Sequence, residues 1–298
     1  MTGPAATVDV TATVDDAAPE IGRPALPPGR AVHLPGRGTT FVREIEGPAD
    51  APTVMLLHGW TVTAAVNWYQ QFDRVADHAH VIAPDHRGHG RGIRTRRPFS
   101  LEDAADDAVA LADELGVDRF AVAGYSMGGP IAQLIAHRHP HRITGMVLAA
   151  TFARQARTRS ERSLMTSIGT VGRGTRALSR RRQLDLLARA SDAFTSAPER
   201  PPWILAEVRS GSVPMMLEAA SAIGRFDSSP WVGSVDVPTG VLVTSHDEIV
   251  GPHLQHHLAA SIPHAEVRHV PVDHDGCVTR PREFNDAFVD LVEHALGP

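Results

Sequence analysis

Lysine is absent from this chain, and all 29 of its basic residues are arginine. This absence excludes Schiff-base enzymes, P-loop nucleotide sites and kinase-type ATP sites, because each of them requires a lysine. Cysteine is almost absent as well. With Cys277 alone, the chain has neither an intramolecular disulfide nor a paired-cysteine zinc or iron–sulfur motif, which fits a reducing compartment.

Long apolar runs and an excess of positive charge are also missing. No stretch approaches the roughly 20 apolar residues that a membrane-spanning helix needs, and residues 1–10 lack the basic start and apolar run of a secretory signal. A formal net charge of −5 argues against sequence-independent binding of nucleic acid. The 298 residues, 42% of them hydrophobic, are enough for a large core. We therefore expect a soluble, cytoplasmic globular protein with no transmembrane segment and no nucleic-acid partner.

Short β-branched runs alternate with segments of helical period from about residue 39 onward. This alternation predicts an α/β protein in which helices cover a mainly parallel sheet. The predicted buried strands are 53–57, 80–83, 119–123, 143–148, 240–244 and 265–270, and a more polar run at 39–45 is predicted to add an edge strand. The predicted helices are 101–115, 127–138, 254–261 and 281–296.

The alternation stops between residues 152 and 236, where we find no convincing strand but helical segments at 183–194 and 215–223. We interpret 152–236 as an inserted helical cap on a core made of residues 31–151 and 237–298. Residues 154–182 hold nine arginines against one glutamate, a composition typical of a solvated face. Residues 1–30 have no sustained period and are predicted to form a disordered tail.

The strongest functional signal is the run Gly124–Gly129, which reads GYSMGG and stands between a predicted strand and a predicted helix. It matches the G-x-S-x-G nucleophile elbow. Glycines suit such a turn because they leave no side chain where the backbone doubles back. The hydroxyl of Ser126 is then exposed at a helix N-terminus, where free amides favour developing negative charge. We predict Ser126 as a nucleophile.

A serine nucleophile requires a histidine base and an acid that orients the histidine. Asp247 follows the predicted strand 240–244, and His274 follows the last predicted strand. Open α/β sheets place their sites at such strand ends. We therefore predict Asp247 as the acid, with Glu248 as the neighbour that could replace it, and His274 as the base. No metal-ligand spacing accompanies the other histidines, so neither a metal nor an organic cofactor is predicted.

The oxyanion formed by serine attack needs hydrogen-bond donors. One predicted donor is the amide of Met127, the residue after the nucleophile. The other is the Trp60 amide in the loop His58-Gly59-Trp60, where Gly59 allows close approach to Ser126. Packing against the cap is an equally good interpretation of the Trp60 indole.

Together, the segments 57–60 (LHGW), 83–90 (APDHRGHG) and 124–129, with Asp247 and His274, resemble the α/β-hydrolase superfamily. The resemblance implies a mostly parallel central sheet flanked by helices, with an inserted helical cap. It supports the two predicted oxyanion donors. It also implies structural, not catalytic, roles for Asp85, Arg87 and His89.

Membership of this superfamily does not choose the reaction. Ser126 excludes the haloalkane dehalogenases and epoxide hydrolases of this fold, which use aspartate. We predict hydrolysis of a small carboxylic ester, because attack of water on an acylated serine is the default outcome of this constellation. An apolar acyl group is predicted because cap residues such as Met215, Met216 and Trp231 could line its pocket. Packing among the cap helices is the preferred interpretation of these side chains. The runner-up reactions are cofactor-free haloperoxidase (perhydrolase) chemistry and carbon–carbon bond hydrolysis. A non-catalytic binder of small molecules is the alternative of a different class.

Overall fold

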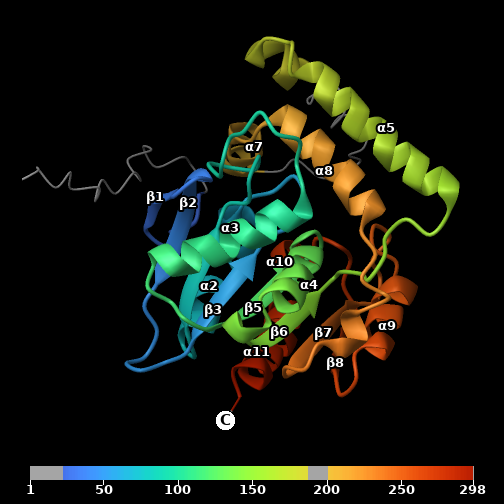
Figure 1. The fold of residues 1–298 in the computed structure, drawn as a ribbon. Helices are drawn as coiled ribbons and strands as arrows, with labels where there is room; N and C mark the ends of the chain where they lie inside the picture. The colour runs from blue at the N-terminus through green and yellow to red at the C-terminus, as the bar shows by residue number, and fades with distance from the viewer. Residues whose placement is uncertain (1–22, 187–200, 298) are drawn as a thin grey trace, which may run out of the picture.

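The computed structural model describes residues 23–186 and 201–297, and its centre is an eight-stranded sheet with the order β1-β2-β4-β3-β5-β6-β7-β8 (Figure 1). The strands are β1 (Gly29–Leu34), β2 (Gly38–Ile45), β3 (Thr53–Leu57), β4 (His80–Pro84), β5 (Phe120–Tyr125), β6 (Ile143–Ala149), β7 (Thr239–Thr244) and β8 (Glu266–Val270). Only the pairs β1–β2 and β2–β4 are antiparallel, and from β4 to β8 every pair is parallel. The predicted mainly parallel sheet is confirmed.

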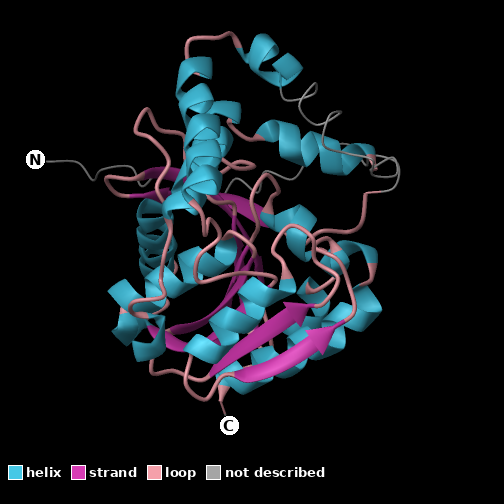
Figure 2. Cartoon of the chain, turned by 90° about the vertical axis from the view of Figure 1, so that its right-hand side faces the viewer, coloured by secondary structure: helices cyan, strands magenta, loops and turns pink. Residues whose placement is uncertain are grey.

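Helices cover both faces of this sheet (Figures 1 and 2). One face carries α1 (Ala64–Trp68), α2 (Phe72–Ala76) and α11 (Pro281–Leu296), and the other carries α3 (Leu101–Glu114), α4 (Gly128–Arg138) and α9 (Pro252–Ser261). Alternate side chains of β3 show the two layers, because Val54 and Leu56 pack into the first and Met55 and Leu57 into the second. Two short elements, η1 (Pro140–Arg142) and α10 (Gly276–Thr279), complete the core.

The N-terminal edge of the sheet differs from the sequence-based expectation. The strand expected at 39–45 is β2, which is not an edge strand, because it pairs with β4 on one side and with β1 on the other. We did not predict β1, whose short alternation of buried Val32 and Leu34 follows a Pro- and Gly-rich stretch that signals a loop. Residues 1–22 of the predicted tail lie outside the described residues, and β1 includes the last two residues of that range.

The described parts of the chain between β6 and β7, 150–186 and 201–238, consist of helices joined by loops. Its elements are α5 (Arg159–Thr175), α7 (Pro202–Ser210), α8 (Val213–Arg225) and η2 (Val232–Ser234), and these two ranges contain no strand. In Figure 1, α5 and α8 lie side by side beyond the sheet. Helix α8 includes the predicted segment 215–223. Of the predicted segment 183–194, residues 183–186 are helical, and the remainder lies outside the described residues.

Helix α5 was not predicted, because its arginines and polar residues suggested only a solvated face. Two local features allow it. Thr158 and Glu161 form a reciprocal capping box at its first turn. Gly169 lets α8 approach closely, since a Cβ at this position would lie 2.4 Å from the Cβ of Ser221. The cap at its first turn and the close packing on α8 therefore stabilise α5, although the helix has few apolar positions.

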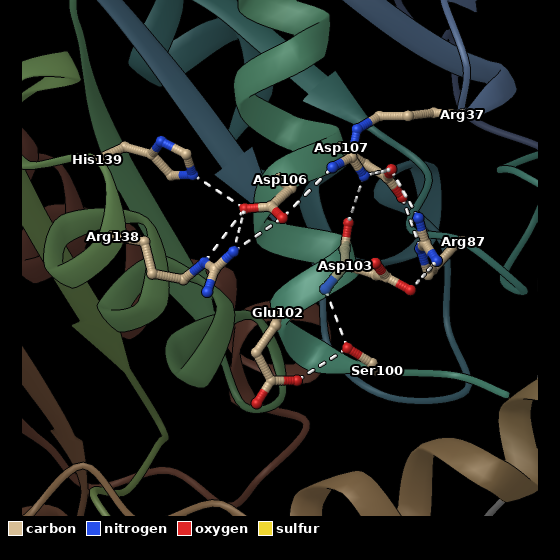
Figure 3. Close-up of polar contacts among 9 residues, drawn as sticks. All are labelled: Arg37, Arg87, Ser100, Glu102, Asp103, Asp106, Asp107, Arg138 and His139. Atoms are coloured by element: carbon tan, nitrogen blue, oxygen red, sulfur yellow. Dashed lines mark hydrogen bonds and ion pairs between the residues drawn. The ribbon is translucent and has the colours of Figure 1, made fainter.

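A buried ion-pair network fastens the loop after β4 to α3 (Figure 3). The guanidinium of Arg87 donates to both carboxylate oxygens of Asp107, at 2.6 and 2.7 Å, and to Asp103 at 2.7 Å. Arg37 also donates to Asp107, at 2.7 Å. Arg87 and Asp107 are only 5% and 8% exposed. These contacts agree with a structural role for Arg87.

We expect Arg87→Ala to lower the free energy of unfolding by about 3 kcal/mol, because it leaves the buried Asp107 carboxylate with Arg37 as its one remaining ion-pair partner among the described residues. Urea unfolding monitored by circular dichroism measures the loss. The matched control is Arg74→Ala, which removes an exposed pair with Asp286 and should cost under about 1 kcal/mol. Equal losses in the two variants would show that the buried network contributes no more than a surface pair.

Candidate active site

The residues predicted to act together follow three different strands at one edge of the sheet. Ser126 comes directly after β5, Asp247 three residues after β7, and His274 four residues after β8. These strands are parallel, so their carboxyl ends share an edge. Parallel pairing thus brings residues as far apart in sequence as Ser126 and His274 into contact.

The His274 ring touches both of the other side chains. Its Nδ1 lies 2.7 Å from Asp247 Oδ2, and its Nε2 lies 3.0 Å from the Ser126 hydroxyl oxygen. An ionised carboxylate only accepts hydrogen bonds, so Nδ1 carries the proton and Nε2 is free to accept the proton of Ser126. The Asp247 side chain is fully buried, and that of His274 is 14% exposed.

Further donors hold the Asp247 carboxylate in place. They are the Ile249 and Val250 amides, which donate to Oδ1 at 2.9 and 2.8 Å, and the Thr244 hydroxyl and Gln255 amide, which donate to Oδ2 at 2.8 and 3.3 Å. Glu248, the alternative acid, is exposed, and the histidine's contact is with Asp247. The geometry therefore favours Asp247 over Glu248.

The turn that carries Ser126 is strained in the manner of a nucleophile elbow. Ser126 has φ +51°, a left-handed conformation that costs a non-glycine residue about 1–3 kcal/mol. Its carbonyl is held by the Gly129 amide at 2.9 Å and by the Thr151 hydroxyl at 2.7 Å. Glycine is required at 128, since a Cβ there would lie 2.1 Å from the Leu57 carbonyl oxygen. Helix α4 therefore packs directly against the end of β3.

The loop after β3 lies against this turn. A Cβ on Gly59 would come within 3.4 Å of the Ser126 Cβ, so the backbone of the loop passes beside the nucleophile candidate. The Gly59 amide donates to Asn67 Oδ1 at 2.8 Å, and the Gly59 carbonyl accepts from His58 Nδ1 at 2.8 Å. Since the Trp60 N–H belongs to the same peptide group as the Gly59 carbonyl, His58 sets its direction.

The two predicted oxyanion donors occupy suitable backbone positions. Met127 is the N-cap residue of α4, where amides have no partner inside the helix. Trp60 stands in the loop beside Ser126, and its indole nitrogen donates to the Met216 carbonyl of α8 at 2.7 Å. The indole of Trp60 therefore contacts α8, which agrees with the expectation that it packs against the cap. The backbone amide of Trp60 lies in the loop and is independent of this contact.

Three histidines, His58, His86 and His89, are buried together beneath this loop. The ring centroids of His58 and His86 are 4.2 Å apart, and those of His58 and His89 are 5.5 Å apart. Burial lowers the pKa of His58 to about 4 and that of His89 to about 3, and it holds the pKa of His86 well below 6.5. All three are thus neutral at pH 7. A neutral His58 can accept the His86 amide hydrogen at Nε2, at 2.9 Å.

These lowered pKa values make the fold acid-sensitive. Between pH 6.5 and 4 the unfolded chain binds protons at these histidines and the folded chain does not, so stability falls as the pH falls. Each such histidine contributes a slope of about 1.4 kcal/mol per pH unit. We expect His89→Asn, whose amide can still donate to the Arg87 carbonyl, to reduce the slope by about that amount. Urea unfolding at pH 7, 6 and 5 measures it, and an unchanged slope would contradict the assignment.

The histidines outside the site do not form a metal centre in the described part of the chain. Within residues 23–186 and 201–297 no cluster of three or more His, Cys, Asp or Glu side chains could hold a metal ion. His137 instead stacks on Trp231, and His139 pairs with Asp106. Over the same described ranges, no helix combines the length and the apolar character needed to cross a membrane.

Comparison with known proteins supports the fold. The family model for the α/β hydrolase fold matches residues 52–281, so the chain belongs to this family. A putative carbamate hydrolase (RutD) of Caulobacter segnis is 27% identical over 85% of this chain and 96% of its own length. A putative non-heme haloperoxidase of Mycobacterium phage D29 is 29% identical over 67% and 73%. The crystal structure of an enol-lactonase from Burkholderia xenovorans LB400 superposes with a TM-score of 0.71 at 24% identity, covering 88% of this chain and 99% of that one.

These likenesses confirm the expected α/β-hydrolase fold and identify the chain as a hydrolase of that superfamily. They do not select a reaction, because the three proteins differ in what their names say they act on. Sequence reasoning missed Asn67, Thr244 and Gln255, which hold the loops of the site. A buried polar residue inside the apolar run AAVNW was the available signal for Asn67.

Proposed function

We propose that this protein is a serine hydrolase of the carboxylesterase class (EC 3.1.1), which cleaves carboxylic esters through an acyl-enzyme. The observation that carries the proposal is the continuous contact from Asp247 through His274 to Ser126, at 2.7 and 3.0 Å. In this arrangement a neutral imidazole can take the serine proton while the buried carboxylate stabilises the imidazolium that forms.

The acylation step follows from these positions. Ser126 Oγ forms a bond to the ester carbonyl carbon as its proton passes to His274 Nε2. The carbonyl oxygen becomes an oxyanion, which the Trp60 and Met127 amides bind. When the tetrahedral intermediate collapses, the bond to the alkoxy oxygen breaks, and His274 gives its proton to the departing alcohol.

Deacylation repeats the chemistry with water. His274 Nε2 takes a proton from water as the water oxygen bonds to the acyl carbon, and the bond to Ser126 Oγ then breaks. The proton returns to Ser126, and the carboxylic acid leaves. The proposed catalytic cycle is complete without a metal or an organic cofactor.

The surroundings of the site favour an apolar acyl group. Met127 and Phe152 belong to one apolar cluster with Ile223 and Phe226, which lie at the C-terminal end of α8, and Trp60 packs against this cluster. We propose that the acyl group binds against this apolar region, which accepts hydrocarbon more readily than charge. We assign the cap role to residues 152–236, over a core of 31–151 and 237–298. A cytoplasmic location is part of the proposal, supported by the single buried thiol of Cys277.

Perhydrolysis is the second candidate, favoured by the likeness to a haloperoxidase. There hydrogen peroxide would replace water in attacking the same acyl-enzyme and release a peracid. Esterase and perhydrolase therefore share the first step and differ in the second. Carbon–carbon bond hydrolysis remains a further alternative.

The test is hydrolysis of p-nitrophenyl esters from acetate to palmitate, together with an enol-lactone and a carbamate, by the intact protein. We expect turnover of at least one ester and a chain-length optimum that reports the size of the acyl pocket. Peracid formation with acetate and hydrogen peroxide, at a rate above ester hydrolysis, would favour the second candidate. Failure of a fluorophosphonate probe to label Ser126 would support a non-catalytic binder.

A further inference from the structure

Three buried polar side chains lie beneath the site and take no part in the proposed mechanism: Asn67, Tyr125 and Cys277. We propose that these side chains, together with the backbone of residues 274–277, form one chain of contacts that fixes the oxyanion loop and the base relative to each other, which makes Asn67 and Tyr125 positioning residues for the reaction. This inference rests on the proposed function and adds residues that the sequence motifs did not identify.

One end of the chain holds the base. The Tyr125 hydroxyl donates to the carbonyl oxygen of His274 at 2.5 Å. Tyr125 immediately precedes Ser126, so a single side chain joins the nucleophile turn to the loop of the base. The ring is 3% exposed, and it packs edge-on against Trp68, with centroids 5.9 Å apart, and against Phe284. This packing holds the ring that carries the hydroxyl.

The other end holds the oxyanion loop. Asn67, in α1, accepts the Gly59 amide hydrogen at Oδ1 (2.8 Å) and donates through Nδ2 to the Cys277 sulfur (3.6 Å). Asn67 and Cys277 are each only 3% exposed. Cys277 lies three residues after His274, within α10. Asn67 therefore links the peptide group before the Trp60 amide to the segment that carries the base.

The two ends meet on one short segment of backbone. Tyr125 holds the carbonyl of His274, and Asn67 reaches the sulfur of Cys277 three residues later. The base and the oxyanion loop are therefore both fastened to residues 274–277.

The Tyr125 hydroxyl must keep its proton to donate to the His274 carbonyl. Burial raises the pKa of Cys277 to about 12 and that of Tyr125 well above 10. Both groups therefore stay protonated at pH 7. The same burial makes the Cys277 thiol a poor nucleophile.

The location of the chain argues for more than packing. Tyr125 and Cys277 belong to the apolar layer beneath the sheet, where phenylalanine and alanine would fill space without the cost of burying polar atoms. The Tyr125 hydroxyl instead donates to the His274 carbonyl, and the Cys277 sulfur accepts from Asn67, so the chain ends on the peptide groups that position the two reacting parts of the site. A shift of a fraction of an ångström at either end misplaces the base or the oxyanion donor.

The test compares Tyr125→Phe with the intact protein. The variant keeps the ring and removes only the hydroxyl. We expect the second-order rate of Ser126 labelling by a fluorophosphonate to fall about tenfold, and kcat for the best p-nitrophenyl ester to fall equally with KM unchanged. Thr40→Val is the matched control, because it removes a buried hydroxyl that donates to the Asp85 carbonyl at 3.0 Å, away from the chain. It should label at the rate of the intact protein.

A second pair of variants tests the thiol. Cys277→Ser keeps a donor and acceptor at this position and should label within about threefold of the intact protein, whereas Cys277→Ala should resemble Tyr125→Phe. Unchanged labelling rates in both Tyr125→Phe and Cys277→Ala, with Ser126 of the intact protein labelled normally, overturn the chain and leave the proposed function standing. If Ser126 of the intact protein is not labelled at all, the proposed function fails and this inference fails with it.

Discussion

Ser126→Ala should reduce kcat for ester hydrolysis by about 10⁵-fold while leaving the protein folded. The loss is large because no other hydroxyl can form the acyl-enzyme, and the residual rate comes only from the oxyanion donors and binding. Folding should be preserved for a physical reason. Alanine at φ +51° has the same left-handed backbone strain as serine, and among the described residues Ser126 Oγ hydrogen-bonds only to the His274 ring.

The measurement is steady-state hydrolysis with the best p-nitrophenyl ester, together with mass spectrometry of the Ser126 peptide after quenching. The intact protein should carry the acyl group on this peptide, and the variant should not. Ser245→Ala, in the exposed loop before Asp247, is the control and should keep full activity. A variant at position 126 that keeps more than a tenth of the wild-type kcat would remove Ser126 from the mechanism.

Asp247→Asn should lower kcat by about 10⁴-fold at pH 7, and the contacts of the carboxylate explain why. Oδ1 accepts two backbone amides, from Ile249 and Val250. An asparagine must place its oxygen there, so its NH₂ group faces His274 Nδ1. His274 then has to accept at Nδ1 and carry its proton on Nε2, where it can no longer take the proton of Ser126.

Glu248→Gln is the matched control, because it makes the same chemical change at the next residue. Glu248 is exposed, and we expect kcat to change less than about twofold. Circular dichroism and urea unfolding of both variants separate a loss of catalysis from a loss of fold. If Glu248→Gln is the damaged variant and Asp247→Asn is active, the acid has been assigned to the wrong residue.

Much of the central architecture was predictable from local pattern. The buried strands from β3 to β8 were expected within two residues of their observed ends, because a strand covered on both faces reads as a short continuous apolar run bounded by loop residues. The turn at Ser126 was predictable as well, since glycines at 124 and 128 mark a backbone that leaves no room for a Cβ.

Local pattern did not decide other features. β1 was missed, and β2 was wrongly expected at the edge, because pairing partners are not encoded in a strand's own residues. Helix α5 has too few apolar positions to be recognised, and it packs on α8 through glycines. The roles proposed for Asn67 and Tyr125 depend on distances between loops that lie far apart in sequence.

The sequence by itself determined the order of strands and helices along the chain and the residue types at each strand end, because these depend on periodicity and turn chemistry within a few residues. Only the tertiary structure decided that Asp247 and not Glu248 faces His274, and which side chains hold the loops of the site together. Those outcomes depend on parallel strands bringing their carboxyl ends to one edge, where direction and distance of a few ångströms select the contacts.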